Sequence, residues 1–550
     1  MCFVMSSGET VGEYLLSSLK NIGVNEVFGI PGDMVIRFFK LLEDDPDIHL
    51  CTFSHEPAVG FAAIGSARAT QKPAVACVTY GAGGLNMVNS VACAYAEKTP
   101  LIVVSGGPAL KARGNDIFLH HMVKHFDSQL NVYEEVTQMA VILDDPVTAG
   151  RKIDEALATC REYSLPVYIE LPADIVDEPV SIPENIKITM NNKKPVDEAS
   201  REIVNRLTTA ERPVIMMGVE AERFRLRDDI MILSNRFKVP VISSLLARDL
   251  APLDNPNFFG TYLGEAGNSA AKRLVDESDF LLLLGVVLTD VNLGSRLVKT
   301  KGVEMIQCVS RQVKSTNQVY DNVSLKDLLG ELLKVEPVRK EAVFPEKEVL
   351  QINRVCKYTR SPIVTGEIVD ALNWFFSEYG EMPIISDTGD CLFTTLKMKT
   401  STVMAPAYYG TMGFAVPAAI GYSVTTGKRP VVLVGDGGFQ MTGPEICHCP
   451  RYDINPIFVL YNNSRWGMEQ VFYPSAGFNE LVNWSYAKLA DLWGGKGYFC
   501  DDCDSLYRAL EDAEHQEKFT LIEIITSKEE LSDELLAWME EQKQSLSRSG

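Results

Sequence analysis

Apolar runs of strand length recur along this sequence, separated by amphipathic stretches of helical length. Each run is almost continuously apolar instead of alternating with polar residues, which is typical of strands that helices cover on both faces. The pattern therefore predicts an α/β fold built on parallel sheets with helices on each side. The predicted strands span residues 74–79, 101–105, 167–171, 214–217, 280–287, 383–386, 431–434 and 457–461.

Two segments interrupt this rhythm and are interpreted as linkers. Residues 178–199 are rich in Pro, Asn and Lys, and residues 335–362 mix charges with several prolines. We expect three doubly wound parallel-sheet domains, each long enough to bury its own core. Their predicted bounds are residues 1–185, 196–336 and 360–550.

The composition narrows the class of protein. Hydrophobic residues make up 46% and charged residues 23% of the 550-residue chain, as is usual for globular proteins. The formal net charge of −21 argues against a nucleic-acid-binding surface. No run reaches the ~18 uncharged apolar residues of a membrane span, and no secretory signal pattern opens the chain. We expect a cytoplasmic protein whose 12 cysteines are mostly buried free thiols, not a zinc site.

The most informative motif follows the predicted strand 431–434. That strand runs directly into Gly435-Asp436-Gly437-Gly438, and the strand 457–461 ends in Asn462-Asn463. Glycines let backbone N–H groups approach phosphate oxygens, and Mg²⁺ takes hard oxygen ligands such as those of Asp436 and Asn463. These residue types also favour simple turns, so the first motif alone is weak evidence. The two motifs together, at the edge where parallel strands end, predict a metal-bridged diphosphate site.

This pattern resembles the thiamine diphosphate motif of transketolases, acetohydroxy acid synthases and pyruvate decarboxylases. The resemblance implies that Asp436, Asn463 and the backbone carbonyl of Arg465 bind Mg²⁺, with Gly437 and Gly438 beside the diphosphate. It covers nearly the whole chain and implies a pyrimidine-binding, a middle and a diphosphate-binding domain, in that order.

Two positions depart from the family pattern. Gly438 stands where Ser or Ala often follows the Gly-Asp-Gly triplet, and Asp390 stands where a hydroxyl residue often lies near the diphosphate. Neither departure removes a catalytic group, but Asp390 adds negative charge next to the expected cofactor.

The other half of the cofactor site is predicted near Glu56, which opens a helical stretch through residue 69. A Glu at this position is also a favourable charge at the positive end of a helix dipole. The resemblance implies that Glu56 hydrogen-bonds the pyrimidine ring and activates the cofactor. It further implies that Gly410 and Met412 hold the bent cofactor and that Thr388 lies beside the thiazolium and the diphosphate. In this family the two halves face each other across subunits, so we expect a homodimer that pairs into a homotetramer.

The reaction is predicted from Asp33, His120, His121 and Glu469. Taken singly, each has an ordinary interpretation as a turn, surface or solvated helix residue. Together they resemble the proton-handling set of the pyruvate decarboxylase and indolepyruvate–phenylpyruvate decarboxylase branch. Forming an aldehyde requires a proton at the carbon that loses carbon dioxide and removal of one from the hydroxyl, which suits such groups. We therefore expect decarboxylation of a 2-oxo acid to an aldehyde and carbon dioxide.

The substrate follows less directly from the sequence. Met412, Met468 and Trp538 are candidates for an apolar pocket that accepts phenylpyruvate or indolepyruvate, with core packing as the equal alternative. Trp538 lies in a helical stretch, residues 533–544, that we interpret as a lid. The alternative function is an acetohydroxy acid synthase-like or acyloin-forming carboligase. A cofactor-binding subunit without turnover is disfavoured because Glu56 is present.

Overall fold

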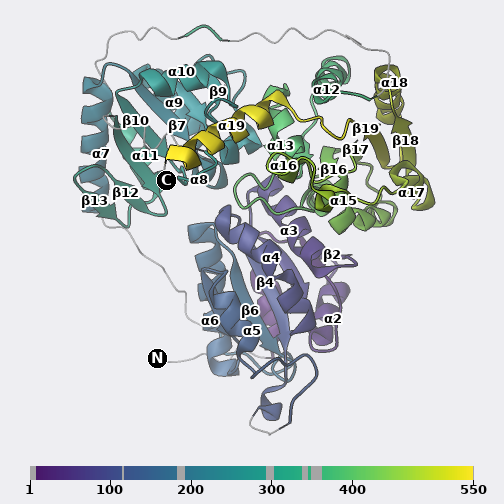
Figure 1. Cartoon of the computed structure of the whole chain (residues 1–550). Coiled ribbons are helices and arrows are strands. Elements are labelled where there is room, and N and C mark those ends of the chain that lie inside the picture. Colours follow the sequence, from purple (N-terminus) through teal and green to yellow (C-terminus); the bar gives the residue numbers. More distant parts are fainter. Residues whose placement is uncertain are drawn as a thin grey trace. The chain divides into compact units, whose positions relative to one another are not determined.

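The computed structural model describes residues 8–113, 117–182, 193–292, 303–336, 345–347 and 362–548. These residues contain three sheets flanked by helices, which confirms the predicted α/β class (Figure 1). Every predicted strand is present, with ends that differ by a few residues. The chain forms two compact units: unit 1 is Met1–Thr189 with Gly413–Lys428 and Thr442–Ile454, and unit 2 is the remainder. No described helix is both long and apolar enough to cross a membrane.

The sheet of unit 1 is entirely parallel, in the order β2-β1-β3-β4-β6-β5. Its first helix starts with a capping box, in which the Thr10 hydroxyl accepts from the Glu13 N–H and the Glu13 carboxylate accepts from the Thr10 N–H. The elements are α1 Val11–Asn21, β1 Glu26–Gly29, α2 Ile36–Asp44, β2 His49–Thr52, α3 Glu56–Thr70, β3 Ala74–Val78, α4 Ala82–Ala96, β4 Leu101–Gly107, η1 Leu110–Ala112, α5 Ser128–Glu134, β5 Met139–Ile142, α6 Pro146–Tyr163 and β6 Val167–Pro172.

Unit 1 also contains α14 (Ala415–Thr426), which packs closely on α3. A Cβ atom on Gly65 of α3 would lie 2.1 Å from the carbonyl oxygen of Ala418, and one on Gly421 of α14 would lie 2.0 Å from that of Ala62. Each helix therefore needs a glycine where it meets the backbone of the other.

The middle sheet, in unit 2, has the order β13-β12-β11-β10-β7-β8-β9 and is mixed. It departs from the expected all-parallel arrangement because β11 and β12 are joined by only Ser310 and Arg311, both with positive φ (53° and 60°). Such a two-residue turn leaves no room for a crossover helix and forces an antiparallel pair. The elements are α7 Lys193–Thr209, β7 Pro213–Met217, α8 Val219–Arg223, α9 Arg227–Phe237, β8 Val241–Ser243, η2 Leu245–Leu250, β9 Phe258–Thr261, α10 Ser269–Glu277, β10 Phe280–Leu284, β11 Glu304–Val309, β12 Gln312–Lys314, β13 Val319–Asp321 and α11 Leu325–Leu332.

The third sheet, also in unit 2, is parallel in the order β15-β14-β16-β17-β19-β18. Because β14, β16 and β17 are neighbours, the segments that follow them meet at one edge. The elements are α12 Thr365–Tyr379, β14 Ile384–Ser386, α13 Asp390–Thr394, η4 Thr395–Lys397, β15 Val403–Met404, β16 Val431–Gly435, α15 Asp436–Thr442, η5 Gly443–His448, η6 Pro450–Tyr452, β17 Ile457–Asn462, α16 Gly467–Gln470, η7 Gly477–Asn479, α17 Tyr486–Leu492, β18 Lys496–Cys500, α18 Cys503–Glu514, β19 Thr520–Ile525 and α19 Asp533–Arg548.

The structure also tests the predicted linkers and the predicted state of the cysteines. Helix α7 begins at Lys193, so the linker interpretation is wrong for residues 193–199. Most of the second predicted linker lies outside the described residues. The described cysteines are free and, apart from Cys447, buried, as expected. The predicted C-terminal helix is present as α19 and extends to Arg548.

Candidate active site

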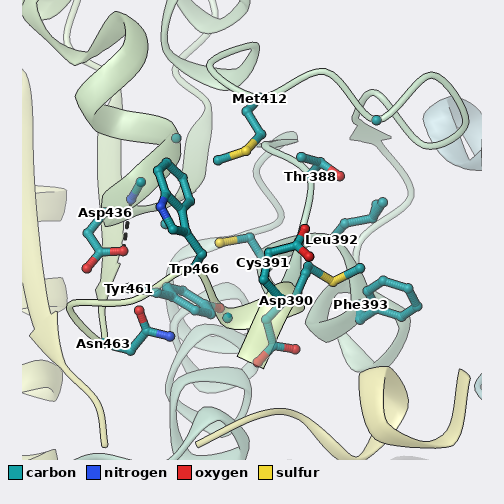
Figure 2. A pocket seen from close by; sticks show the side chains of 18 of the residues that line it. Thr388, Asp390, Cys391, Leu392, Phe393, Met412, Asp436, Tyr461, Asn463 and Trp466 are labelled. Carbon is teal, nitrogen blue, oxygen red and sulfur yellow. Dashed lines mark hydrogen bonds between the residues drawn. The ribbon is translucent and has the colours of Figure 1, made fainter. Parts of the chain in front are cut away.

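A cavity of about 360 Å³ lies in unit 2 at the edge where β14, β16 and β17 end (Figure 2). The glycine-rich ends of these strands form one wall and apolar side chains form the other. All the site positions that the sequence assigns to the diphosphate domain line this one cavity. They are Thr388, Gly410, Met412, Asp436, Gly437, Gly438, Asn463, Arg465, Met468, Glu469 and Trp538.

The polar end of the cavity contains the predicted metal ligands. Asp436 begins α15 directly after β16 and is 2% exposed. Its carboxylate accepts the N–H groups of Gly437 (2.8 Å) and Ser464 (2.7 Å), and the Asn463 amide oxygen accepts the N–H of Arg465 (3.0 Å). Burial raises the pKa of Asp436 to about 7. No Lys, Arg or His among the described residues forms an ion pair with this carboxylate, so a carboxylate and an amide oxygen, hard ligands suited to Mg²⁺, line the polar end of the cavity.

The glycines of this wall differ in what they face. A Cβ atom on Gly435 would meet nothing within 4 Å, so a ligand can approach that backbone closely. On Gly437 it would lie 2.2 Å from the ring of Trp466, which Figure 2 shows projecting into the pocket. On Gly438 it would lie 3.2 Å from the carboxyl carbon of Asp387. Ser or Ala at this position would therefore require the Asp387 side chain to shift by a few tenths of an ångström.

Asp390, the second departure from the family pattern, has a structural partner. Its carboxylate accepts the backbone N–H of Ser532 (2.9 Å) and the Ser532 hydroxyl. Ser532 directly precedes α19, so the negative charge lies near the positive end of that helix dipole. Burial raises the pKa of Asp390 to about 6. The carboxylate thus fastens the start of α19, which accounts for its presence beside the cavity.

The apolar end of the cavity includes residues that sequence reasoning missed. The rings of Phe393 and Trp538 lie 5.4 Å apart, centre to centre. Trp538 Nε1 is buried and has no hydrogen-bond partner among the described residues, so it is a free donor at the cavity wall. Cys391, Phe393 and Tyr461 line the cavity but lie in apolar segments that read as core. Their only signal is their position at the end of β17 (Tyr461) or in α13, the helix that follows β14 (Cys391 and Phe393).

In unit 1 the structure brings together Asp33, His120 and His121. His120 Nε2 lies 2.5 Å from Asp33 Oδ2, and His121 Nε2 lies 3.7 Å from Asp33 Oδ1. The hydrogen bond from His120 holds the pKa of Asp33 below its ordinary value. His121 has a positive φ of 68°, and its carbonyl lies where a Cβ on Gly81 would sit, at 2.1 Å. The three side chains are partly exposed, at 55%, 63% and 32% respectively.

Glu56 is also in unit 1, as the first residue of α3. Pro57 follows it within the first turn, where its fixed φ suits a helix start. The Glu56 carboxylate accepts a 2.7 Å hydrogen bond from the Asn86 side-chain amide on α4. The side chain is half-buried and its direction is fixed by this bond.

Comparison with known proteins identifies the family. Three family models match in order: the N-terminal TPP binding domain of thiamine pyrophosphate enzymes over residues 9–132, their central domain over 200–333 and their C-terminal TPP binding domain over 387–524. Indole-3-pyruvate decarboxylase of Azospirillum brasilense is 38% identical over 537 residues, covering 97% of this chain and 98% of the relative. The chain belongs to the thiamine diphosphate-dependent decarboxylase family.

Two more distant relatives support the family. Pyruvate decarboxylase 3 of Arabidopsis thaliana is 28% identical over 561 residues, covering 97% of this chain and 93% of the relative. Pyruvate decarboxylase 2 of Nicotiana tabacum is 26% identical over 588 residues, covering 97% and 94%. The thiamine diphosphate-dependent 2-oxo acid decarboxylase predicted from the sequence is therefore confirmed at the level of the reaction class, while the roles of single residues stay predictions.

Proposed function

We propose that this decarboxylase converts an aromatic 2-oxo acid, indolepyruvate or phenylpyruvate, to the corresponding aldehyde and carbon dioxide, using thiamine diphosphate and Mg²⁺. The observation that carries the substrate class is the apolar end of the cavity, where the rings of Phe393 and Trp538 pack against each other at an interplanar angle of 48° and Met468 also lines the wall. Aromatic walls favour aromatic ligands. The name of the Azospirillum relative agrees with this choice.

The chain supplies the binding groups for the cofactor, which when bound provides the nucleophilic carbon and the electron sink for decarboxylation. Asp436, Asn463 and the Arg465 carbonyl would hold Mg²⁺ against the diphosphate. Backbone N–H groups at Gly437 and Gly438 lie at the start of a helix, where negative charge is favoured. Glu56, with its direction set by Asn86, would share a proton with the pyrimidine ring nitrogen.

The proton transfers are assigned to four side chains. The carbon that loses carbon dioxide gains one proton, and the hydroxyl formed at the former 2-oxo group loses one as the aldehyde leaves. Asp33 lies within hydrogen-bond distance of His120 and within ion-pair distance of His121, so a proton can pass between neighbouring groups of this cluster. Glu469 lies at the cavity wall and would oppose the substrate carboxylate, favouring its departure.

The assembly is part of the proposal. Following the family arrangement, the Glu56-bearing domain of one copy would face the diphosphate domain of another, giving a homodimer that pairs into a homotetramer. The cytoplasmic location and the domain bounds 1–185, 196–336 and 360–550 stay predictions. Sedimentation at enzyme concentrations used in assays would test the assembly, and a monomer with full activity would contradict it.

The substrate class is tested by comparing kcat/KM for indolepyruvate, phenylpyruvate, pyruvate and a branched 2-oxo acid. We expect the aromatic acids to be preferred, and Trp538→Leu to reduce that preference by about 10- to 100-fold because an aromatic wall is lost. Trp493→Leu, which does not line the cavity, is the matched control. A preference for pyruvate in the native enzyme would contradict the aromatic assignment. Acyloin as the dominant product, instead of free aldehyde, would favour the carboligase alternative.

A further inference from the structure

A second cavity, of about 560 Å³, lies in unit 2 between the middle sheet and α12 and shares no residue with the candidate active site. It is bounded by β9, the first turn of α10, α12 and the segment after η4 (these elements are labelled in Figure 1 where there is room). Its deeper wall is apolar, with Phe258, Phe259, Phe376 and Met398 each 3% to 6% exposed. None of the residues assigned to the reaction or the cofactor lines this cavity.

Arg248, in η2, is a buried charged residue in the lining of this cavity. The residue is 5% exposed, yet among the described residues no carboxylate lies within the 4.0 Å of an ion pair. Its neighbour Asp249 is already paired with Arg223, at 2.8 Å. The only hydrogen bond of the Arg248 side chain within the described chain runs from Nη2 to the Met398 carbonyl (3.2 Å), and its Nε is buried without a partner.

A buried guanidinium without a counter-charge is costly. Transferring a charge from water is unfavourable unless a paired group compensates it, and the cost appears here as a pKa of Arg248 lowered by burial to about 10. Proteins retain Arg at such positions chiefly to bind carboxylates or phosphates through its fork of N–H donors. The vacant donors of Arg248 therefore point to an anion as the missing partner.

Other polar groups around the cavity are already engaged. The Asn373 side chain donates to the Lys397 carbonyl and accepts from the Lys399 N–H. The Glu381 carboxylate accepts from the Thr400 hydroxyl (3.1 Å), and also from a backbone N–H. The other charged residues of the described lining are exposed, namely Asp254, Lys347, Glu381 and Lys399, and the Lys347 ammonium already donates to the Asn255 carbonyl (2.8 Å). Arg248 is thus the one buried cation among the described lining residues, which suits a monoanion better than a phosphate dianion.

We propose that this cavity binds a small monocarboxylic acid with an aromatic or similarly bulky apolar body, its carboxylate on Arg248 and its body against Phe258, Phe259 and Phe376. The site is separate from the candidate active site, and the proposal does not depend on the identity of the 2-oxo acid substrate. Phenylacetate has the required chemistry and lacks the 2-oxo group, so the enzyme cannot turn it over.

Equilibrium dialysis of phenylacetate against the cofactor-loaded enzyme tests the site. We expect the native enzyme to bind one equivalent of phenylacetate per chain at this site, and Arg248→Met to bind that equivalent at least about tenfold more weakly. Phenylacetamide, of the same shape without the charge, should not occupy it. Equal binding of phenylacetate by the native enzyme and Arg248→Met would overturn the proposal, as would an extra equivalent of inorganic phosphate in place of phenylacetate.

A second pair of variants protects the test against a folding defect. Ser377 is exposed on α12 and lines the cavity, so Ser377→Trp should obstruct it while Arg248 stays in place. Glu378→Trp, at the next exposed position but outside the cavity lining, is the control. Loss of the phenylacetate equivalent in Ser377→Trp alone supports the site. Retention of it in Ser377→Trp would mean that Arg248 serves only to bond the Met398 carbonyl, and the proposal would be wrong.

Discussion

Asp33 in unit 1 and Asp436 in unit 2 are carboxylates that the sequence singled out for one reaction, yet their surroundings are opposite. The Asp33 side chain is 55% exposed and is held by His120. Asp436 is 2% exposed and is held by two backbone N–H groups. The hydrogen bond from His120 lowers the pKa of Asp33, whereas burial raises that of Asp436 to about 7.

This difference indicates that the two units have different roles, proton transfer in unit 1 and cofactor binding in unit 2. The cluster in unit 1 pairs its carboxylate with two histidines and stays accessible to water, which suits proton exchange but offers little binding energy. In the cavity of unit 2 the buried Asp436 carboxylate lies beside glycine backbone and forms no ion pair with any described Lys, Arg or His, which suits holding a metal ion and a charged cofactor. Substitutions in unit 1 should therefore change turnover, and those in unit 2 should change cofactor binding or stability.

The largest effect is expected from Glu56→Gln. The amide cannot share a proton with the cofactor, so kcat should fall by about 10²- to 10⁴-fold, while the affinity for thiamine diphosphate stays within about threefold. Steady-state kinetics and a cofactor titration followed by tryptophan fluorescence measure the two quantities. Glu134→Gln, at an exposed position on α5, is the matched control. A kcat within twofold of the native value would remove Glu56 from the role proposed here.

Asp436→Asn tests the other side of the comparison. Loss of the carboxylate charge should weaken Mg²⁺-dependent binding of thiamine diphosphate by about 100-fold, because a hard anionic ligand is replaced by a neutral one. The same fluorescence titration, repeated over a range of Mg²⁺ concentrations, gives the dissociation constant of thiamine diphosphate for the native enzyme and the variant. Asp453→Asn, in an exposed turn, should leave the titration unchanged. If the Asp436 substitution left thiamine diphosphate binding unchanged, the assignment of cofactor binding to unit 2 would be wrong.

A smaller effect is expected from His120→Gln. Without the hydrogen bond from His120, the pKa of Asp33 should rise toward its ordinary value, since that bond is the largest cause of its lowering. Asp33 then becomes protonated at a higher pH, so the acid limb of kcat/KM should shift to higher pH and kcat should fall about 10- to 100-fold. His125→Gln provides a matched histidine control outside the cluster. An unchanged profile would mean that the cluster has no part in proton transfer.

The smallest effect is expected from Asp390→Asn, which keeps an acceptor for Ser532. Burial, with Glu530 and Glu534 nearby, raises the Asp390 pKa from 3.8 to about 6, so the folded protein binds more protons than the unfolded chain in this range. Native stability should therefore decrease as pH rises from about 4 to 6, and the Asn variant should lack this decrease. Thermal midpoints should differ by about 1–2 °C above pH 6 and converge below pH 4. Asp512→Asn is the control, and parallel curves would contradict the assignment.

The features that depend on short stretches of sequence were predicted correctly. The strands, the helix starting at Glu56 and the meeting of Asp436 with Asn463 at one sheet edge follow from periodicity, turn residues and the geometry of parallel sheets. The hairpin at Ser310 and Arg311 was missed because neither residue is Gly, Asn or Asp, the usual signal of a two-residue turn with positive φ at both positions. The pairing of Asp390 with Ser532 joins positions 142 apart, and no sequence period encodes such a pair. Phe393 was missed because a cavity wall and a core have the same apolar composition.

The reciprocal glycines where α3 and α14 cross have a consequence for motion. Gly65 and Gly421 each face a backbone carbonyl of the other helix at a distance that admits no side chain. Neither helix can rotate about its axis or slide by a residue without driving a Cβ atom into that carbonyl. Glu56, at the first turn of α3, therefore projects from a part of unit 1 whose amide hydrogens should be among the slowest to exchange with solvent. The Glu56 carboxylate is therefore carried by a helix that stays in place during the reaction. Any conformational change during turnover must involve other segments of the chain.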